Sequence, residues 1–298
     1  MRTEVGHFLN WSNVTLKPPL SFNDQINLLK RRGMIITDSK NAEEFLSKNS
    51  YYRLNVYFHK LMDQTDHFPD GTHFDHVMSI YSNDQWLRNK YLLLLEPIEV
   101  SIKTMVAYHL GMTYGSECFY NSQIYKNEKT HKKIVQAFMN EQGRNRDDPV
   151  IKHHIVHYEG KFPIWVVVEF LSFNSISKLF NNLFEKDKKL IALAAFSVNE
   201  NYLASWLHAL SVFRNICAHY GFLYKRELAV SPRLFKDFAW DIQQNKSVFA
   251  LSLVIKKISE SSLWREFIIA IDDKEHKSSS FHLSDYGFPR NWRKYLMA

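Results

Sequence analysis

The order of apolar and polar positions predicts helices along most of the chain. Apolar residues recur at spacings of three and four, as on the buried face of an amphipathic helix, and strand-like alternation is rare. After a short helix within 17–33, the segments with helical spacing are 41–48, 74–82, 84–110, 127–140, 163–184, 186–196, 200–219, 232–243, 246–260 and 262–270. Only the aromatic-rich run 51–58 would also suit a strand. We therefore expect an all-α protein.

Local signals predict where the first helix begins and ends and where a boundary follows it. Ser21 can cap a helix, with Asp24 three residues later as in a capping box, and Gly33 supplies a stop. The segment 68–71 (Phe-Pro-Asp-Gly) has the composition of a turn. This turn predicts a boundary between small units of the chain.

Proline and runs of polar residues predict interruptions further along. Pro97 removes a backbone donor, so it is expected to kink or break the helix over 84–110. The segment 141–149 has the polarity of an exposed loop, and 272–280 is the clearest polar, poorly ordered stretch.

These patterns divide the chain into three predicted regions. Residues 1–85 form an N-terminal helical region, residues 86–245 a helical domain, and residues 246–298 C-terminal helices with a basic tail. No repeat at a fixed period is present in the sequence.

Composition and charge narrow the class of protein. Hydrophobic residues make up 45% of the 298 positions, which is enough for a sizeable core and excludes disorder as the main state. The formal net charge of +7 suits a nucleic-acid partner without requiring one. Two cysteines, Cys118 and Cys217, are too few for a disulfide framework and fit a reducing compartment. We expect a cytoplasmic protein with no signal peptide and no membrane span.

The most informative segment is the predicted helix over 200–219. Its apolar stripe consists of Trp206, Leu210, Phe213 and Cys217. Arg214, Asn215 and His219 lie off this stripe, and Asn215 and His219 share a face one turn apart. The spacing therefore places an Arg, an Asn and a His near the end of one helix.

Such a trio can cleave RNA without a metal. Histidine can exchange the proton of a ribose 2′-hydroxyl or of a leaving oxygen, while Arg214 presents several donors to the scissile phosphate. Asn215 would orient either group. A plainer interpretation of the same spacing is a surface network in which His219 caps the helix beside Gly221.

A resemblance favours the catalytic interpretation. The spacing Arg214-Asn215-x-x-x-His219 resembles the RNxxxH signature of the HEPN superfamily, and its surroundings resemble the Abi-like (AbiD/AbiF type) abortive-infection proteins of bacteria. The matching segments, which span about 17–235, are 17–22 with Gln25 and Leu29, 32–33, 51–54 with Tyr57, 87–88, 96–100, 163–165, 169–173 and 213–219.

The resemblance implies a fold and an activity. The expected fold is a HEPN-like helical bundle with an N-terminal helical extension and C-terminal helices. The expected activity is anti-phage defence through RNA cleavage that leaves a 2′,3′-cyclic phosphate, by a homodimer responding to a phage-derived trigger. Two alternatives stay open: an RNA-binding protein that holds a small structured RNA without cutting it, and a sensor of a phage component.

Other residues are candidates for a supporting role. Glu99 and Lys103 form an i, i+4 acid–base pair, which is either an ordinary surface ion pair or a match to the ExxxK element of some HEPN proteins. Arg88 and Glu96 are weaker candidates for the same support.

Candidate RNA contacts follow the signature. Lys225, Arg226 and Arg233 are the nearest supply of positive charge for phosphate groups. The aromatic residues Tyr220, Phe222 and Tyr224 would stack on unpaired bases or, as the more frequent outcome, fill a core.

The sequence gives no reason to expect a cofactor. His153 and His157 are one helical turn apart with His154 between them, but the Glu of an HExxH site is missing and the cysteines are distant. The chain also has no Walker A loop, no dinucleotide-binding glycine pattern and no GxSxG elbow. We expect neither a metal nor an organic cofactor.

Overall fold

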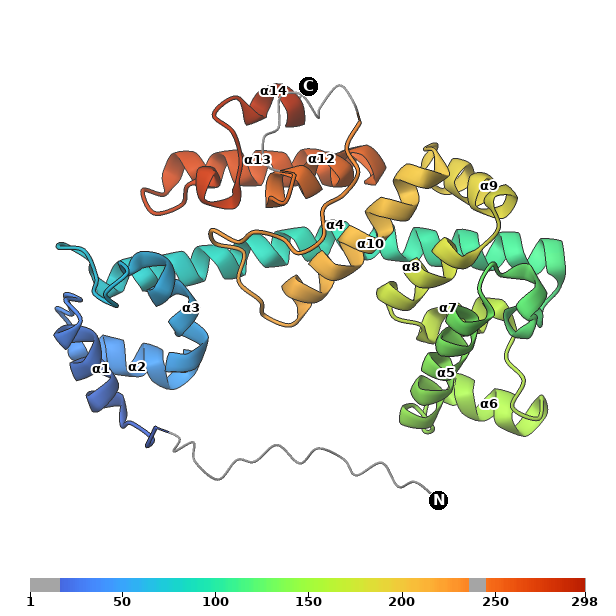
Figure 1. Cartoon of the computed structure of the whole chain (residues 1–298), viewed down its shortest axis with the longest axis horizontal. Helices are drawn as coiled ribbons and strands as arrows, with labels where there is room; N and C mark the ends of the chain where they lie inside the picture. Colours follow the sequence, from blue (N-terminus) through green and yellow to red (C-terminus); the bar gives the residue numbers. More distant parts are fainter. Residues whose placement is uncertain (1–16, 236–244, 298) are drawn as a thin grey trace, which may run out of the picture. The chain divides into compact units, whose positions relative to one another are not determined.

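The computed structural model describes residues 17–235 and 245–297, which are helical with no β-strand (Figure 1). The predicted all-α fold class is confirmed. The chain divides into two compact units, residues 1–79 and 80–298. The boundaries predicted at 85/86 and 245/246 remain predictions. No helix in the described ranges has the length and apolar content that a bilayer crossing requires.

The first unit contains three short helices and the beginning of a fourth. They are α1 (Phe22–Arg31), α2 (Ser39–Asn49), α3 (Tyr51–Leu61) and the first residues of α4 (Phe74–Tyr114). Ser21 caps α1 by accepting a hydrogen bond from the Asp24 amide at 3.1 Å, as the capping pattern predicts. The ambiguous run 51–58 is helical, because Leu54 and Phe58 at i, i+4 point into a core.

Pro97 does not interrupt α4, which runs as one helix of 41 residues. The predicted division into two helices and the predicted break at Pro97 are therefore wrong. Pro97 lies on the solvent side, and so does Leu93, whose carbonyl loses its helical partner at the proline. Water can satisfy that carbonyl, so the helix continues past the proline.

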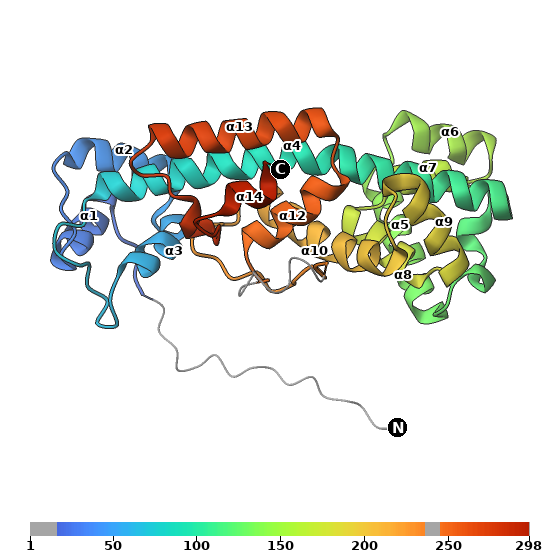
Figure 2. The ribbon, with the colours of Figure 1, turned by 90° about the horizontal axis from the view of Figure 1, so that it is seen from above.

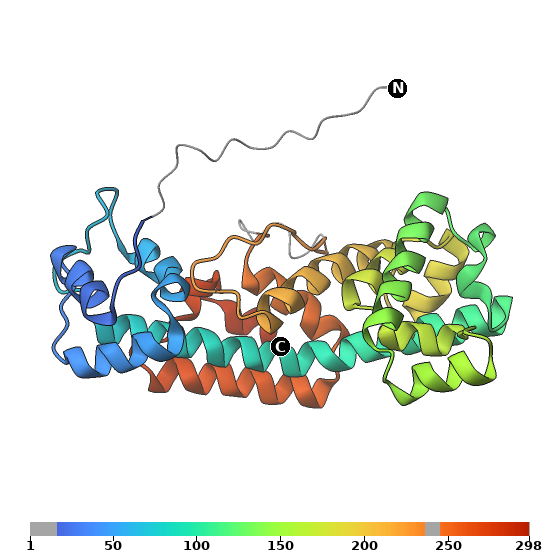
Figure 3. The ribbon, with the colours of Figure 1, turned by 90° about the horizontal axis from the view of Figure 1, so that it is seen from below.

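The second unit is built around the remainder of α4. Its other α-helices are α5 (Glu128–Arg144), α6 (Pro149–His157), α7 (Ile164–Phe170), α8 (Phe173–Asn182), α9 (Glu185–Phe196), α10 (Glu200–Ala218), α12 (Val248–Ile258), α13 (Ser261–Lys277) and α14 (Trp292–Leu296). α10 packs on α8, α9 and α12, while α13 runs along α4 (Figures 2 and 3).

The core of this unit joins α4 to the C-terminal helices. The Tyr91 ring contacts Phe213 of α10 edge-on at a centroid distance of 5.0 Å and Phe267 of α13 at 4.9 Å. Its hydroxyl is 2.6 Å from the Ser252 hydroxyl of α12. The predicted stripe of α10 is confirmed, because Trp206, Leu210, Phe213 and Cys217 are all buried.

Several helix ends differ from the sequence prediction. The predicted helix 163–184 is two helices, because the Ser172 side chain accepts a hydrogen bond from the Ser175 amide and starts α8 there. The predicted loop 141–149 contains the last turn of α5, and α6 follows from Pro149. Most of the predicted helix 232–243 lies outside the described residues, and 232–235 are not helical.

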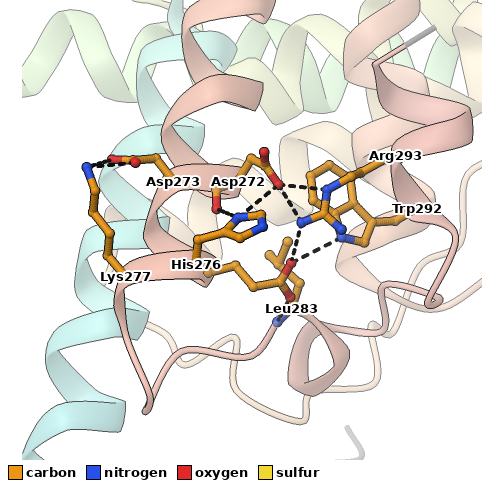
Figure 4. Close-up of polar contacts among 8 residues, drawn as sticks. Asp272, Asp273, His276, Lys277, Leu283, Trp292 and Arg293 are labelled. Carbon is orange, nitrogen blue, oxygen red and sulfur yellow. Dashed lines mark hydrogen bonds and ion pairs between the residues drawn. The ribbon is translucent and has the colours of Figure 1, made fainter.

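The stretch 272–280, predicted to be poorly ordered, is helical as far as Lys277 (Figure 4). Asp273 pairs with Lys277 one turn later, and the Asp272 carboxylate accepts a hydrogen bond from Arg293 Nε at 2.8 Å. Glu275 accepts hydrogen bonds from the Leu283 amide and the Trp292 indole. Charges that look like a solvated linker therefore fasten α13 to the segment that ends in α14.

Candidate functional site

The signature residues lie at the C-terminal end of α10. Arg214 and Asn215 are half-buried in the last turns, and His219 is the exposed C-cap residue. The Gly221 amide donates to the Ile216 carbonyl at 2.7 Å, which closes the helix end, and Tyr220 adopts a left-handed conformation at φ +60°. This turn ends the helix at His219 and leaves its side chain exposed.

Glu99 of α4 joins two cations. Its Oε2 atom lies 3.3 Å from Arg214 Nε, and its Oε1 atom lies 3.4 Å from Lys103 Nζ. Lys103 also donates to the Glu169 carbonyl at the end of α7, at 3.3 Å. The predicted pair of Glu99 and Lys103 is therefore present, and it reaches the signature arginine directly.

These side chains line an open hollow of about 310 Å³, named here the Arg214 hollow. Its lining residues are Leu92, Glu96, Glu99, Val100, Lys103, Glu169, Arg214 and Ala218. The lining includes three acidic and two basic residues, and the Glu99 carboxylate balances the charge of Arg214. An RNA phosphate would have to share or replace the Glu99 carboxylate at Arg214.

His219 follows Ala218 of the lining directly but is itself outside the set of lining residues. Within the described residues its imidazole makes no hydrogen bond or ion pair, so both ring nitrogens are available to a ligand. Asn215 accepts the His219 amide through its backbone carbonyl at 2.9 Å. The arrangement can thus present a cation and an imidazole at one helix end.

A buried aspartate on α4 fixes the chain just beyond the signature. The Asp84 carboxylate accepts hydrogen bonds from the Leu223 and Tyr224 amides at 2.9 and 3.0 Å, and from Arg88 at 2.8 Å. Arg88 is therefore part of this anchor and not of the Arg214 hollow, which Glu96 does line. Sequence reasoning did not identify Asp84, although its i, i+4 spacing to Arg88 was visible.

The predicted RNA contacts differ in how free their charges are. Arg226 is half-buried, lies over the Phe222 ring and donates to the Phe222 carbonyl at 3.2 Å; burial lowers its pKa. Lys225 lies 3.8 Å from the Asp285 carboxylate, and Arg233 lies exposed over the Tyr202 ring. Arg226 is thus the least accessible of the three to a phosphate group.

The three aromatic residues beyond the signature also differ in exposure. Tyr224 is buried, Phe222 is half-buried, and Tyr220 is exposed. Only Tyr220 therefore presents most of its ring to a base.

The histidine group of α6 does not form a metal site in the structure. No set of three or more His, Cys, Asp or Glu residues in the described ranges could hold a metal ion. The rings instead contact one another, with His153 and His157 at a centroid distance of 4.8 Å.

Comparison with known families supports the resemblance in the sequence. Residues 44–225 match the family described as Abi-like protein, and this range covers more than half of the chain. The chain belongs to the Abi-like family. The matched range includes Glu99, Lys103, Arg214 and His219, and the family's description points to abortive-infection defence. No curated protein and no solved structure matches this Abi-like chain.

Proposed function

We propose that this Abi-like protein acts in anti-phage defence as a metal-independent endoribonuclease of the HEPN type. Arg214 binds the scissile phosphate and His219 moves a proton at the ribose 2′-hydroxyl, with Asn215 in support at the same helix end. Glu99 and Lys103 hold the arginine in place. The observation that supports this assignment best is the Arg214–Glu99 ion pair, which lies in an open hollow. Ala218 lines the same hollow, and the exposed His219 is the next residue in the chain.

The proposed reaction balances without a metal or an oxidant. The 2′-oxygen forms a bond to phosphorus as the bond from phosphorus to the 5′-oxygen breaks. His219 accepts the 2′-hydroxyl proton, and the departing 5′-oxygen takes a proton from solvent. Arg214 stabilises the charge that grows on the phosphate oxygens. The products are a 2′,3′-cyclic phosphate and a 5′-hydroxyl.

The proposal includes a homodimer, with RNA as the substrate. Val100 lines the Arg214 hollow and is exposed, and Leu93 is exposed seven residues earlier on the same face of α4. An apolar face beside the hollow suits contact with a second copy of this chain. Val100→Asp would then shift the sedimentation coefficient towards that of a monomer.

The decisive test compares wild type and His219→Ala on total cellular RNA in EDTA, followed by analysis of the 3′ ends. Wild type should produce 2′,3′-cyclic phosphate ends, and His219→Ala should not. His208→Ala is the matched control, because His208 is also an exposed histidine of α10 but does not line the Arg214 hollow. Cleavage that survives in His219→Ala would contradict the assignment.

One observation favours a second candidate, an RNA-binding protein that does not cleave. No side chain within the described residues orients the His219 imidazole, whereas catalytic histidines are commonly held by a hydrogen bond. Such a protein would copurify with RNA, seen as high absorbance at 260 nm, and would lose that RNA as salt rises. Arg214→Ala would lower its affinity for RNA. Neither wild type nor His219→Ala would cleave RNA.

A further inference from the structure

A second hollow, of about 530 Å³, lies between α6, α7 and the loop after α4. Its walls include five ring side chains, His154, His157, Tyr158, Phe162 and Trp165, and we name it the aromatic hollow. None of these residues lines the Arg214 hollow. Two of them belong to the histidine group that carries no metal site, so the proposed catalytic function leaves this cluster unexplained.

The rings form a short stack that ends in solvent. Phe162 and His154 stack at a centroid distance of 5.1 Å with planes 19° apart, and His154 and Tyr158 stack at 5.3 Å and 30°. Phe162 is buried, whereas Tyr158 is 54% exposed. A further flat ring could therefore extend the stack over Tyr158.

Trp165 offers a second flat surface. The indole lies against α4 at Gly111, where a Cβ atom would meet its ring carbons at 3.8 and 3.9 Å. Trp165 is nevertheless 54% exposed. One edge of the indole therefore packs beside α4 at Gly111, and the exposed part of the ring is open to a ligand.

The hollow is formed before any ligand arrives. The Tyr158 and Gly160 amides both donate to the His154 carbonyl at 3.0 Å, which fixes the turn after α6. Glu159 in this turn has a left-handed φ of +52°. The Ile164 amide donates to the Ser116 carbonyl at 2.9 Å, which ties the start of α7 to the loop after α4. A ligand would therefore meet walls that are already in place.

Polar groups at the rim match the edge of a nucleobase. Glu117 and Lys161 line the same hollow as an exposed pair 3.8 Å apart. Base amino groups can donate to the carboxylate, and base carbonyls can accept from the ammonium group.

The aromatic hollow also lies close to the Arg214 hollow. Trp165 and Glu169 are four residues apart on α7, hence on one face, and Glu169 lines the Arg214 hollow. Four helical residues rise by only about 6 Å. A single strand with a phosphate in the Arg214 hollow can therefore bring a nearby base to Trp165.

We propose that the aromatic hollow binds an unpaired nucleobase, which stacks on Tyr158 and Trp165 while its edge contacts Glu117 and Lys161. The hollow thus holds a single-stranded RNA beside the Arg214 hollow and selects unpaired over paired RNA. This inference rests on the proposed function only in taking the base from an RNA strand, because stacking on the hollow does not depend on cleavage.

The first test measures affinity in the absence of cleavage. A short, fluorescein-labelled single-stranded RNA is titrated into His219→Ala protein, and its anisotropy gives Kd. Tyr158→Ala and Trp165→Ala, each added to His219→Ala, should weaken binding about fivefold or more. Tyr52→Ala is the matched control, because Tyr52 is a highly exposed tyrosine that lines no described hollow, and it should leave Kd unchanged. Unchanged Kd values for both hollow variants would overturn the proposal.

A second probe separates base binding from RNA binding. Saturation-transfer NMR with wild-type protein should show transfer to the base protons of adenosine monophosphate, lost in Trp165→Ala, and no transfer to ribose 5-phosphate. If RNA fails to bind but the nucleotide binds in this way, the RNA function is wrong and the base site stands. If neither probe binds wild type, the site is wrong too. Circular dichroism checks that each variant is folded. If Trp165→Ala is unfolded, the result for Tyr158→Ala decides the test.

Discussion

Arg214 and Glu99 meet at 3.3 Å across α10 and α4, and this contact ties the signature to a second element of the chain. Glu99 is mostly buried, whereas more than a third of the Arg214 side chain remains exposed. The carboxylate therefore fixes one side of the guanidinium and leaves other N–H groups for a phosphate.

Glu99→Gln should lower RNA cleavage about tenfold, because Arg214 loses the charged partner that orients it. Initial rates on a labelled single-stranded RNA measure the effect. Glu96→Gln is the matched control, since Glu96 lines the same hollow without an ion pair in the described residues. Equal rates for the two variants would contradict a positioning role for Glu99.

Asp84→Ala should destabilise the protein by about 3–5 kcal/mol, because it leaves Arg88 buried without its counter-charge and frees two backbone amides. The free energy of unfolding in urea measures the loss. Asp273→Ala, which removes a partly exposed helix pair with Lys277, should change it little. A comparable small change for Asp84→Ala would refute the anchor role.

Gly221→Ala should destabilise the end of α10, because a Cβ atom there would lie 2.9 Å from Ile216 Cγ2 and 3.0 Å from its carbonyl oxygen. Thermal unfolding should show a lower Tm, and RNA cleavage should fall with it. By contrast, Gly143→Ala in α5 meets nothing within 4 Å and should raise stability by about 0.5–1 kcal/mol. A neutral Gly221→Ala would show that this turn can relax.

Stability should fall as pH rises above about 9. Burial raises the pKa of Cys118 from 9.0 to about 11 and raises the pKa values of Cys217, Tyr91 and Tyr125. The unfolded state then releases protons that the folded state keeps, which favours unfolding between these pKa values. Cys118 alone should contribute about 1 kcal/mol of loss at pH 10. Urea unfolding at pH 8 and pH 10 under reducing conditions measures it, and a Cys118→Ala variant should lose less.

The sequence was sufficient where a local pattern decided the outcome. The stripe from Trp206 to Cys217 predicted the buried face of α10, and Ser21 predicted the start of α1, because helix periodicity and capping depend on neighbouring residues. The break predicted at Pro97 was wrong, because the effect of a proline inside a helix depends on whether the carbonyl four residues earlier, here that of Leu93, faces solvent or core. That fact belongs to tertiary structure.

The candidate site divides in the same way. The pairing of Glu99 with Lys103 follows from i, i+4 spacing, and the structure shows it. The approach of Glu99 to Arg214 joins residues more than a hundred positions apart, and no local pattern reveals it. The same holds for Asp84, whose amide partners Leu223 and Tyr224 follow the signature. The prediction that 272–280 is poorly ordered was wrong for a related reason, because the distant Arg293 donates a hydrogen bond to Asp272 and helps to order this segment.

Because α4 continues past Pro97, one rigid helix sets the spacing between the contacts that hold the chain before and after the Arg214–His219 signature. Asp84 holds the chain after His219, and Glu99 holds Arg214 before it, fifteen residues further along the same helix. Deleting a single residue between Asp84 and Glu99 would rotate one of these side chains by about 100° around the helix axis relative to the other. Point substitutions between these two residues leave their spacing unchanged, whereas a single-residue insertion or deletion there should separate the two contacts and abolish the site.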